Sequence, residues 1–313
     1  MTWSLLSNSL GFAGLAAGLA LGFGLTAALA LASLPRRLQI LGVGLAAVAL
    51  VLPPFLVANC WLDLLGHTGR WRAWLPIPLF DLRTAAALMA LMLWPIPMLA
   101  ALGAWQRLAP AHLEIEPRLA GRRLLRHLLL PAAWPALALA TALTFVLALA
   151  NLALPAILQV KVYTVEIWLR FSTNFDLAGA FAASLPVVLA PIAVWLVLQR
   201  AEVTWPRWQE TVTPTLLRQR LGWTVLLPAG VLTCGIVFLA TALPLGQILT
   251  ETRTWSELGP ALAAGGRAVW NSAWLAAVTA TLTVGIGPVG WRWRWGPRSG
   301  FRSCSRASSW ASC

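Results

Sequence analysis

Histidine, lysine and cysteine are among the side chains of this chain that could act as general acids or bases, nucleophiles or metal ligands. None falls in an HExxH, GxSxG or GxxxxGK[ST] pattern, and the histidines, His67, His112 and His127, all lie between apolar runs. The single lysine, Lys161, lies in a predicted outer loop, so the chain lacks the phosphate-binding lysine of an ATPase. We therefore predict no enzymatic activity.

The cysteines show no CxxC pair and no histidine at ligand spacing. We therefore predict no disulfide framework, no metal site and no cofactor, and interpret the cysteines as small apolar filler. They are Cys60, Cys234, Cys304 and Cys313.

The most informative polar segment is a short arginine-rich stretch, HLEIEPRLAGRRLLRHLLLP, between His112 and Pro131. It separates two apolar runs that are each long enough to cross a membrane. The stretch is therefore predicted to be a charged loop that re-enters the bilayer at Leu130-Pro131.

The composition excludes a water-soluble globule. Hydrophobic residues make up 59% of the 313 residues, charged residues only 11%, and the mean hydropathy is +0.76. The apolar runs are continuous and near the ~20 residues that a helix needs to cross the hydrocarbon core, so we predict an all-α polytopic membrane protein with about seven transmembrane helices. The predicted spans are 9–32, 38–59, 84–105, 128–158, 178–198, 221–248 and 270–288.

The net charge of +13 comes from arginines in the loops between these spans. Placing the amino terminus outside puts sixteen basic residues in the inner loops and carboxyl-terminal tail, against seven in the outer loops. Because basic residues of short loops favour the cytoplasm, residues 106–127 and 199–220 are predicted inside and residues 60–83 outside.

Four regions are predicted along the chain. Residues 1–198 form a first half, 199–220 a polar cytoplasmic linker, 221–288 the start of a second half, and 289–313 an Arg/Trp/Ser-rich tail. A weak repeat supports two halves, since Asn8-Ser9-Leu10 and Asn271-Ser272-Ala273 open apolar runs in the same way. The tail has two interpretations, a basic membrane-surface segment or the product of a shifted reading frame.

The predicted spans contain no Asp, Glu, Lys, Arg or His, which argues against a proton-driven carrier. Thr141, Thr144 and Asn151 are the polar residues of the spans that we expect to be candidates for a translocation path. The structural interpretation, in which they bond neighbouring helices, is favoured over that role.

The arginine-rich stretch resembles the cytoplasmic coupling loop of permeases from ATP-binding-cassette importers, which reads Glu-Ala-Ala, three residues, Gly, then a basic helix and Leu-Pro. Gly121 matches the glycine, and Ile115-Glu116-Pro117 stand in place of Glu-Ala-Ala. The resemblance continues through residues 145–158, 163–168 and 174–182. In these segments the chain is similar to the ferric-iron branch of such permeases, which includes thiamine and polyamine relatives. The resemblance implies an ATPase-coupling role for Glu116, Arg118, Gly121, Arg122, Arg123, Arg126, Leu130 and Pro131.

The resemblance further implies a location in a bacterial inner membrane and a type I permease fold whose first half lacks its usual first span and whose second half is partial. The implied partners are a cytoplasmic ATPase, a periplasmic substrate-binding protein and a second permease chain, with ferric iron as the implied substrate. Two alternatives stay open: a membrane scaffold or assembly protein, and a secondary transporter, which the charge-free spans disfavour.

Overall fold

The computed structural model describes residues 3–106, 108, 119–198 and 214–295, and the regular secondary structure of this part of the chain is all helical, without a strand. It confirms the predicted all-helical class. The chain forms two compact units, residues 1–248 and 249–313. The predicted linker falls partly outside the described residues, since only its last residues, from Pro214, are described.

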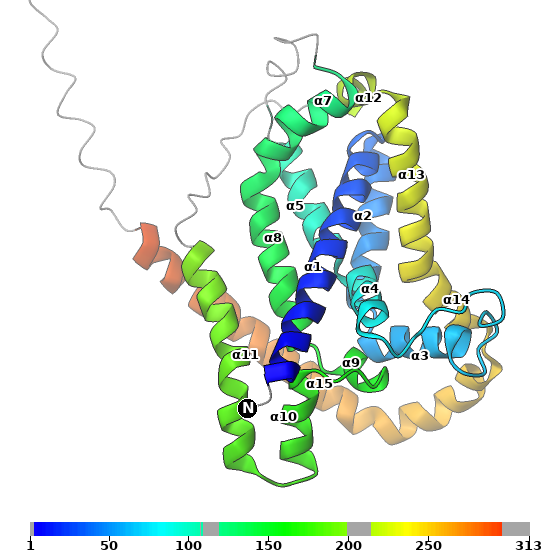
Figure 1. Cartoon of the computed structure of the whole chain (residues 1–313), viewed down its shortest axis with the longest axis vertical. Helices are drawn as coiled ribbons and strands as arrows, with labels where there is room; N and C mark the ends of the chain where they lie inside the picture. The colour runs from blue at the N-terminus through cyan, green and yellow to red at the C-terminus, as the bar shows by residue number, and fades with distance from the viewer. Residues whose placement is uncertain (1–2, 107, 109–118, 199–213, 296–313) are drawn as a thin grey trace, which may run out of the picture. The chain divides into compact units, whose positions relative to one another are not determined.

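The first unit contains most of the helices. Their order is α1 (Trp3–Ala32), α2 (Arg36–Val51), α3 (Pro54–Leu65), α4 (Leu82–Leu93), α5 (Pro95–Trp105), α7 (Gly121–Leu124), the π-helical turn η1 (Leu125–Leu129), α8 (Leu130–Ala150), α9 (Ala153–Ile157), α10 (Tyr163–Ser172), α11 (Leu177–Leu198), α12 (Pro214–Leu221), α13 (Trp223–Val237), the π-helical turn η2 (Phe238–Ala242) and α14 (Leu243–Thr250) (Figure 1).

Four helices are long and apolar enough to cross a membrane: 3–32, 121–150, 177–194 and 223–250. Two helix pairs bring the number to six if each counts as one span. The pair α2–α3 bends by 89° and the pair α4–α5 by 44°. Both bends coincide with prolines, which remove a backbone N–H and clash with the preceding turn. They are Pro53, Pro54, Pro95 and Pro97.

The second unit contains the long helix α15 (Thr252–Trp295), in which the described side chains are mostly exposed. The seventh predicted span, 270–288, lies within it. Among the described residues α15 does not qualify as a candidate span, so the structure supports four to six spans where the sequence predicts about seven.

Helix α1 is the centre of the first unit, where it packs against α4, α5, α8 and α13. Its buried face is made mainly of small residues, which let neighbouring backbones approach closely. The closest approach is at Gly24: a Cβ atom there would lie 2.7 Å from the Met98 nitrogen and 2.8 Å from the Trp94 carbonyl oxygen. The glycine is therefore required where α1 crosses the α4–α5 bend.

Two hydrogen bonds between distant segments mark one end of the first unit. The Asn8 side-chain amide donates to the Lys161 carbonyl (3.2 Å), and the Tyr163 N–H donates to the Ser9 hydroxyl (2.7 Å). Helix α3 packs against α9 at this end. We call residues 8–9, 66–81 and 151–176 the hairpin end, after the helical hairpin α10–α11.

The opposite end gathers the segments that join α1 to α2, lead into α8 and lead into α13, with α7 packed against α12 (Figure 1). We call residues 33–37, 119–130 and 214–223 the arginine end. These ranges contain no Asp or Glu. Their arginines are Arg36, Arg37, Arg122, Arg123, Arg126, Arg218 and Arg220.

The α1 crossing predicts that Gly24→Ala destabilises the protein by about 1–3 kcal/mol, because the added methyl meets backbone atoms that cannot move aside. Thermal loss of monodisperse protein in detergent measures the effect. Gly22→Ala is the matched control, since a Cβ atom at Gly22 meets nothing within 4 Å. Equal midpoints for the two variants would show that the crossing is loose.

The two ends predict opposite accessibility across the membrane. In a background without the native cysteines, Trp74→Cys at the hairpin end and Arg122→Cys at the arginine end place thiols at exposed positions. With the orientation expected from the basic loops, a membrane-impermeant maleimide added outside labels position 74 and spares position 122. Labelling of both positions from one side would refute a membrane-spanning first unit.

Candidate functional site

The arginine-rich stretch is helical from Gly121 onward and continues without interruption into the span that ends at Ala150. Gly121 has a φ of +57°, in the left-handed region that a side chain disfavours. A Cβ atom at Gly121 would lie 3.7 Å from the Leu221 carbonyl oxygen, an ordinary contact. The need for glycine is therefore conformational, as expected for a residue that turns the chain into a helix.

The helical turns after Gly121 are strongly two-sided. Leu124 and Leu129 are buried in the hydrophobic core, at 1% and 0% exposure, so the leucine face holds the helix to the bundle. The opposite face carries the cationic and imidazole side chains, all exposed, and lines a hollow of about 620 Å³. They are Arg122, Arg123, Arg126 and His127.

Pro131 does not end this helix. Proline cannot donate to the carbonyl four residues earlier, here His127, and its ring crowds that carbonyl. The backbone responds with the wider π turn η1, after which the α-helix resumes. The same arrangement recurs at η2, which contains Ala240, four residues before Pro244.

One contact at this turn was not predicted from the sequence. The indole N–H of Trp105, a buried residue at the end of α5, donates to the Leu129 carbonyl over 2.9 Å. This bond ties the π turn to the neighbouring helix. A tryptophan at the end of an apolar run, just before a polar loop, was the available signal.

Helix α12 is the second element that the sequence analysis missed. It packs against α7 at the arginine end, and its residues Leu217 and Leu221 are buried. The Arg218 guanidinium lies over the Trp223 ring, 4.9 Å from its centroid, and Trp223 is 67% exposed. Tryptophan is enriched at the headgroup level of membranes, so this exposed pair is suited to the membrane surface.

The candidate pathway residues bond to backbone. The hydroxyls of Thr141 and Thr144 donate to the carbonyls of Leu137 and Ala140, four residues earlier in their own helix, each over 2.8 Å. The Asn151 side-chain oxygen accepts the Leu154 N–H over 3.1 Å. Thr141 also lines a hollow between α1 and α8, whereas Thr144 is fully buried.

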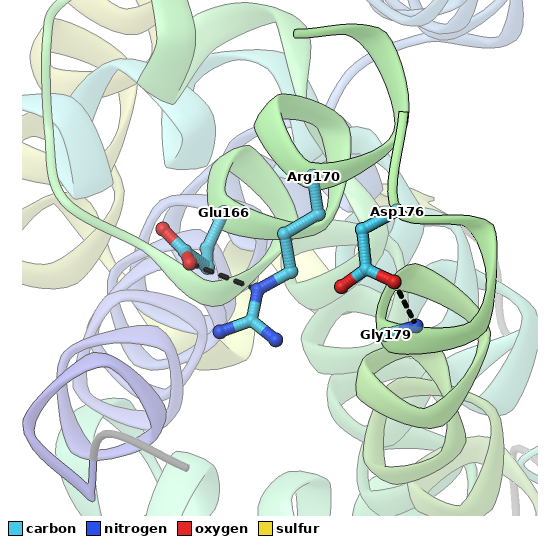
Figure 2. Close-up of polar contacts among 4 residues, drawn as sticks. All are labelled: Glu166, Arg170, Asp176 and Gly179. Atoms are coloured by element: carbon cyan, nitrogen blue, oxygen red, sulfur yellow. Dashed lines mark hydrogen bonds and ion pairs between the residues drawn. The ribbon is translucent and has the colours of Figure 1, made fainter. Parts of the chain in front are cut away.

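The segments 163–168 and 174–182, which extend the family resemblance, form the helical hairpin at the opposite end (Figure 2). Within α10, Arg170 pairs with Glu166 over 3.0 Å. At the turn, the Asp176 carboxylate accepts the Gly179 N–H over 2.9 Å and caps α11. The hairpin is thus held by local contacts.

Two of the predicted coupling residues, Glu116 and Arg118, lie outside the described residues. The others are brought together on one helix. His67 stacks on Phe80, with ring centroids 5.3 Å apart, remote from the arginine end. Among the described residues no group of three His, Cys, Asp or Glu side chains is placed to hold a metal ion.

No protein-family model matches the chain, and a search of curated proteins finds no match.

The geometry at Gly121 predicts a graded response to substitution. Gly121→Asn is mildest, since asparagine tolerates a left-handed conformation; Gly121→Ala costs about 1–2 kcal/mol, and Gly121→Val costs more. Hydrogen exchange of the amides in 122–128 measures local opening, which should increase in that order. Gly103→Ala, in α5 with open space around it, is the control. An order set by side-chain volume alone would refute the conformational argument.

Proposed function

We propose that this chain is a permease subunit of an ATP-binding-cassette importer, contributing a substrate path through the membrane and coupling it to a separate ATPase. The chain itself is proposed to have no enzymatic activity. The membrane setting rests on its candidate spans. The transport role rests on the resemblance of the arginine-rich stretch, together with the shape that this stretch takes.

The observation that carries the proposal is the two-sided helix after Gly121. Its leucine face is buried in the bundle and its arginine face is exposed. A movement imposed on the arginines would therefore be transmitted to α8 through an unbroken helix, and to α5 through the Trp105–Leu129 hydrogen bond. A coupling surface requires this combination of exposed contacts and rigid attachment.

The electrostatics favour an acidic partner. The described ranges of the arginine end contain arginines and no carboxylates, so a surface with acidic side chains finds no repulsion there. Arginine is suited to such contacts because its guanidinium group binds a carboxylate in a bidentate manner. The proposed partner at this end is the cytoplasmic ATPase.

The remaining assignments follow the proposed role. The arginine end faces the cytoplasm of a bacterial cell and the hairpin end faces a periplasmic substrate-binding protein, with a second permease chain as a further partner. About seven spans, in a type I permease arrangement with a partial second half, are proposed for the full chain. Ferric iron is the proposed substrate.

Charge reversal tests the coupling surface. Arg122→Glu with Arg123→Glu should lower the recovery of an ATPase co-purified from the native host by about tenfold or more, since each reversal replaces an attractive contact with a repulsive one. Membrane insertion should be unaffected because both residues are exposed outside the apolar run. Co-purification followed by immunoblotting measures the loss.

The matched control is Arg36→Glu with Arg37→Glu, which makes the same charge change at the same end. Loss in both double variants would indicate a diffuse charge effect. Full recovery of the ATPase with the 122/123 variant would refute the coupling assignment, and absence of any ATPase from the native preparation would favour a scaffold.

A further inference from the structure

Two hollows meet on the outer face of the helix 121–150. The first is the basic hollow of about 620 Å³, which contains Arg126 and His127. The second is an apolar groove of about 480 Å³ lined by α1, α8 and Val194 of α11. Leu130 lines both, and Arg126 lies about one helical turn before it, so the two hollows adjoin along one face of this helix.

The apolar groove has an open floor on α1. Gly14 and Gly18 line it, and a Cβ atom at either position would meet nothing within 4 Å. Its α8 wall runs from Leu130 through Trp134 to Phe145, a rise of about 22 Å at 1.5 Å per residue. The groove is therefore long, narrow and apolar, as a hydrocarbon chain requires.

The position of the basic hollow fits the membrane surface. Helix α8 has 21 residues and is about 31 Å long, which matches the ~30 Å hydrocarbon core if the core begins near Leu130. Arg126 and His127 then lie one turn, about 5 Å, outside the hydrocarbon, at headgroup depth. Arg122 and Arg123 lie a further turn into the water.

We infer that the joined hollows form a binding site for one anionic phospholipid, with its phosphate at Arg126 and His127 and an acyl chain along the α1–α8 groove. Charge complementarity selects an anionic headgroup, because the described part of this end has cations without carboxylates. The apolar groove lies beside the cations at Leu130, which favours a lipid over a free phosphate. This inference does not depend on the proposed function.

Native mass spectrometry of the full chain in detergent tests the site, with phosphatidylglycerol and phosphatidylcholine of identical acyl chains as probes. The wild-type chain should retain phosphatidylglycerol preferentially. Arg126→Gln should lower its affinity for phosphatidylglycerol about fivefold, the effect expected for one cation at the membrane surface. Arg37→Gln, an equal charge change at the same end, should leave the affinity unchanged.

A second pair of variants tests the groove. Gly18→Leu fills it and should weaken the binding of both lipids, whereas Gly11→Leu, on the same helix with equally open surroundings but outside the groove, should not. The headgroup variants and the groove variants are independent tests, so if a variant of one pair misfolds, the other pair still tests the site. Equal losses with Arg126→Gln and Arg37→Gln would overturn the site. So would a change of oligomeric state with Gly18→Leu at unchanged lipid binding, because it would assign the groove to a transmembrane helix.

Discussion

The close crossing of α1 over the α4–α5 bend is the contact on which the first unit depends. Lipid is as apolar as leucine, so transmembrane helices associate through close packing and not through burial from water. At Gly24 the backbones approach to distances that exclude a methyl group. Because α1 also packs against α8 and α13, this crossing sets the position of the helices that form the arginine end.

Two groups of prolines in the described part of the chain distort the backbone in different ways, whereas others, such as Pro135 and Pro228, lie inside α-helices. Where prolines occur in pairs, at 53–54 and at 95 and 97, the helix bends by 89° or 44°. At Pro131 and Pro244 a π turn absorbs the misfit and the helix continues. The difference matters for the proposed coupling role, because that role requires an unbroken helix such as the one from Gly121 to Ala150.

The arginine end combines rigidity on one side with open chemistry on the other. Leu124 and Leu129 are buried in the core, and the Trp105 indole N–H donates a hydrogen bond to the Leu129 carbonyl. The exposed arginines consequently occupy defined positions without acidic neighbours in the described ranges of this end. Such a surface suits partners that carry negative charge. In the two proposals, a lipid phosphate binds at headgroup depth, and the carboxylates of a protein partner bind one helical turn further into the water.

The sequence by itself determined the helical class and the membrane environment, because both follow from local properties: continuous apolar runs and sparse charge. It did not determine that 38–59 and 84–105 bend, that Pro131 is accommodated by a π turn, or that α12 packs on α7. Those outcomes depend on which neighbour is present to stabilise a distorted backbone. The joined hollows at Leu130 are likewise a tertiary property, since the groove exists only where the glycines of α1 lie beside α8.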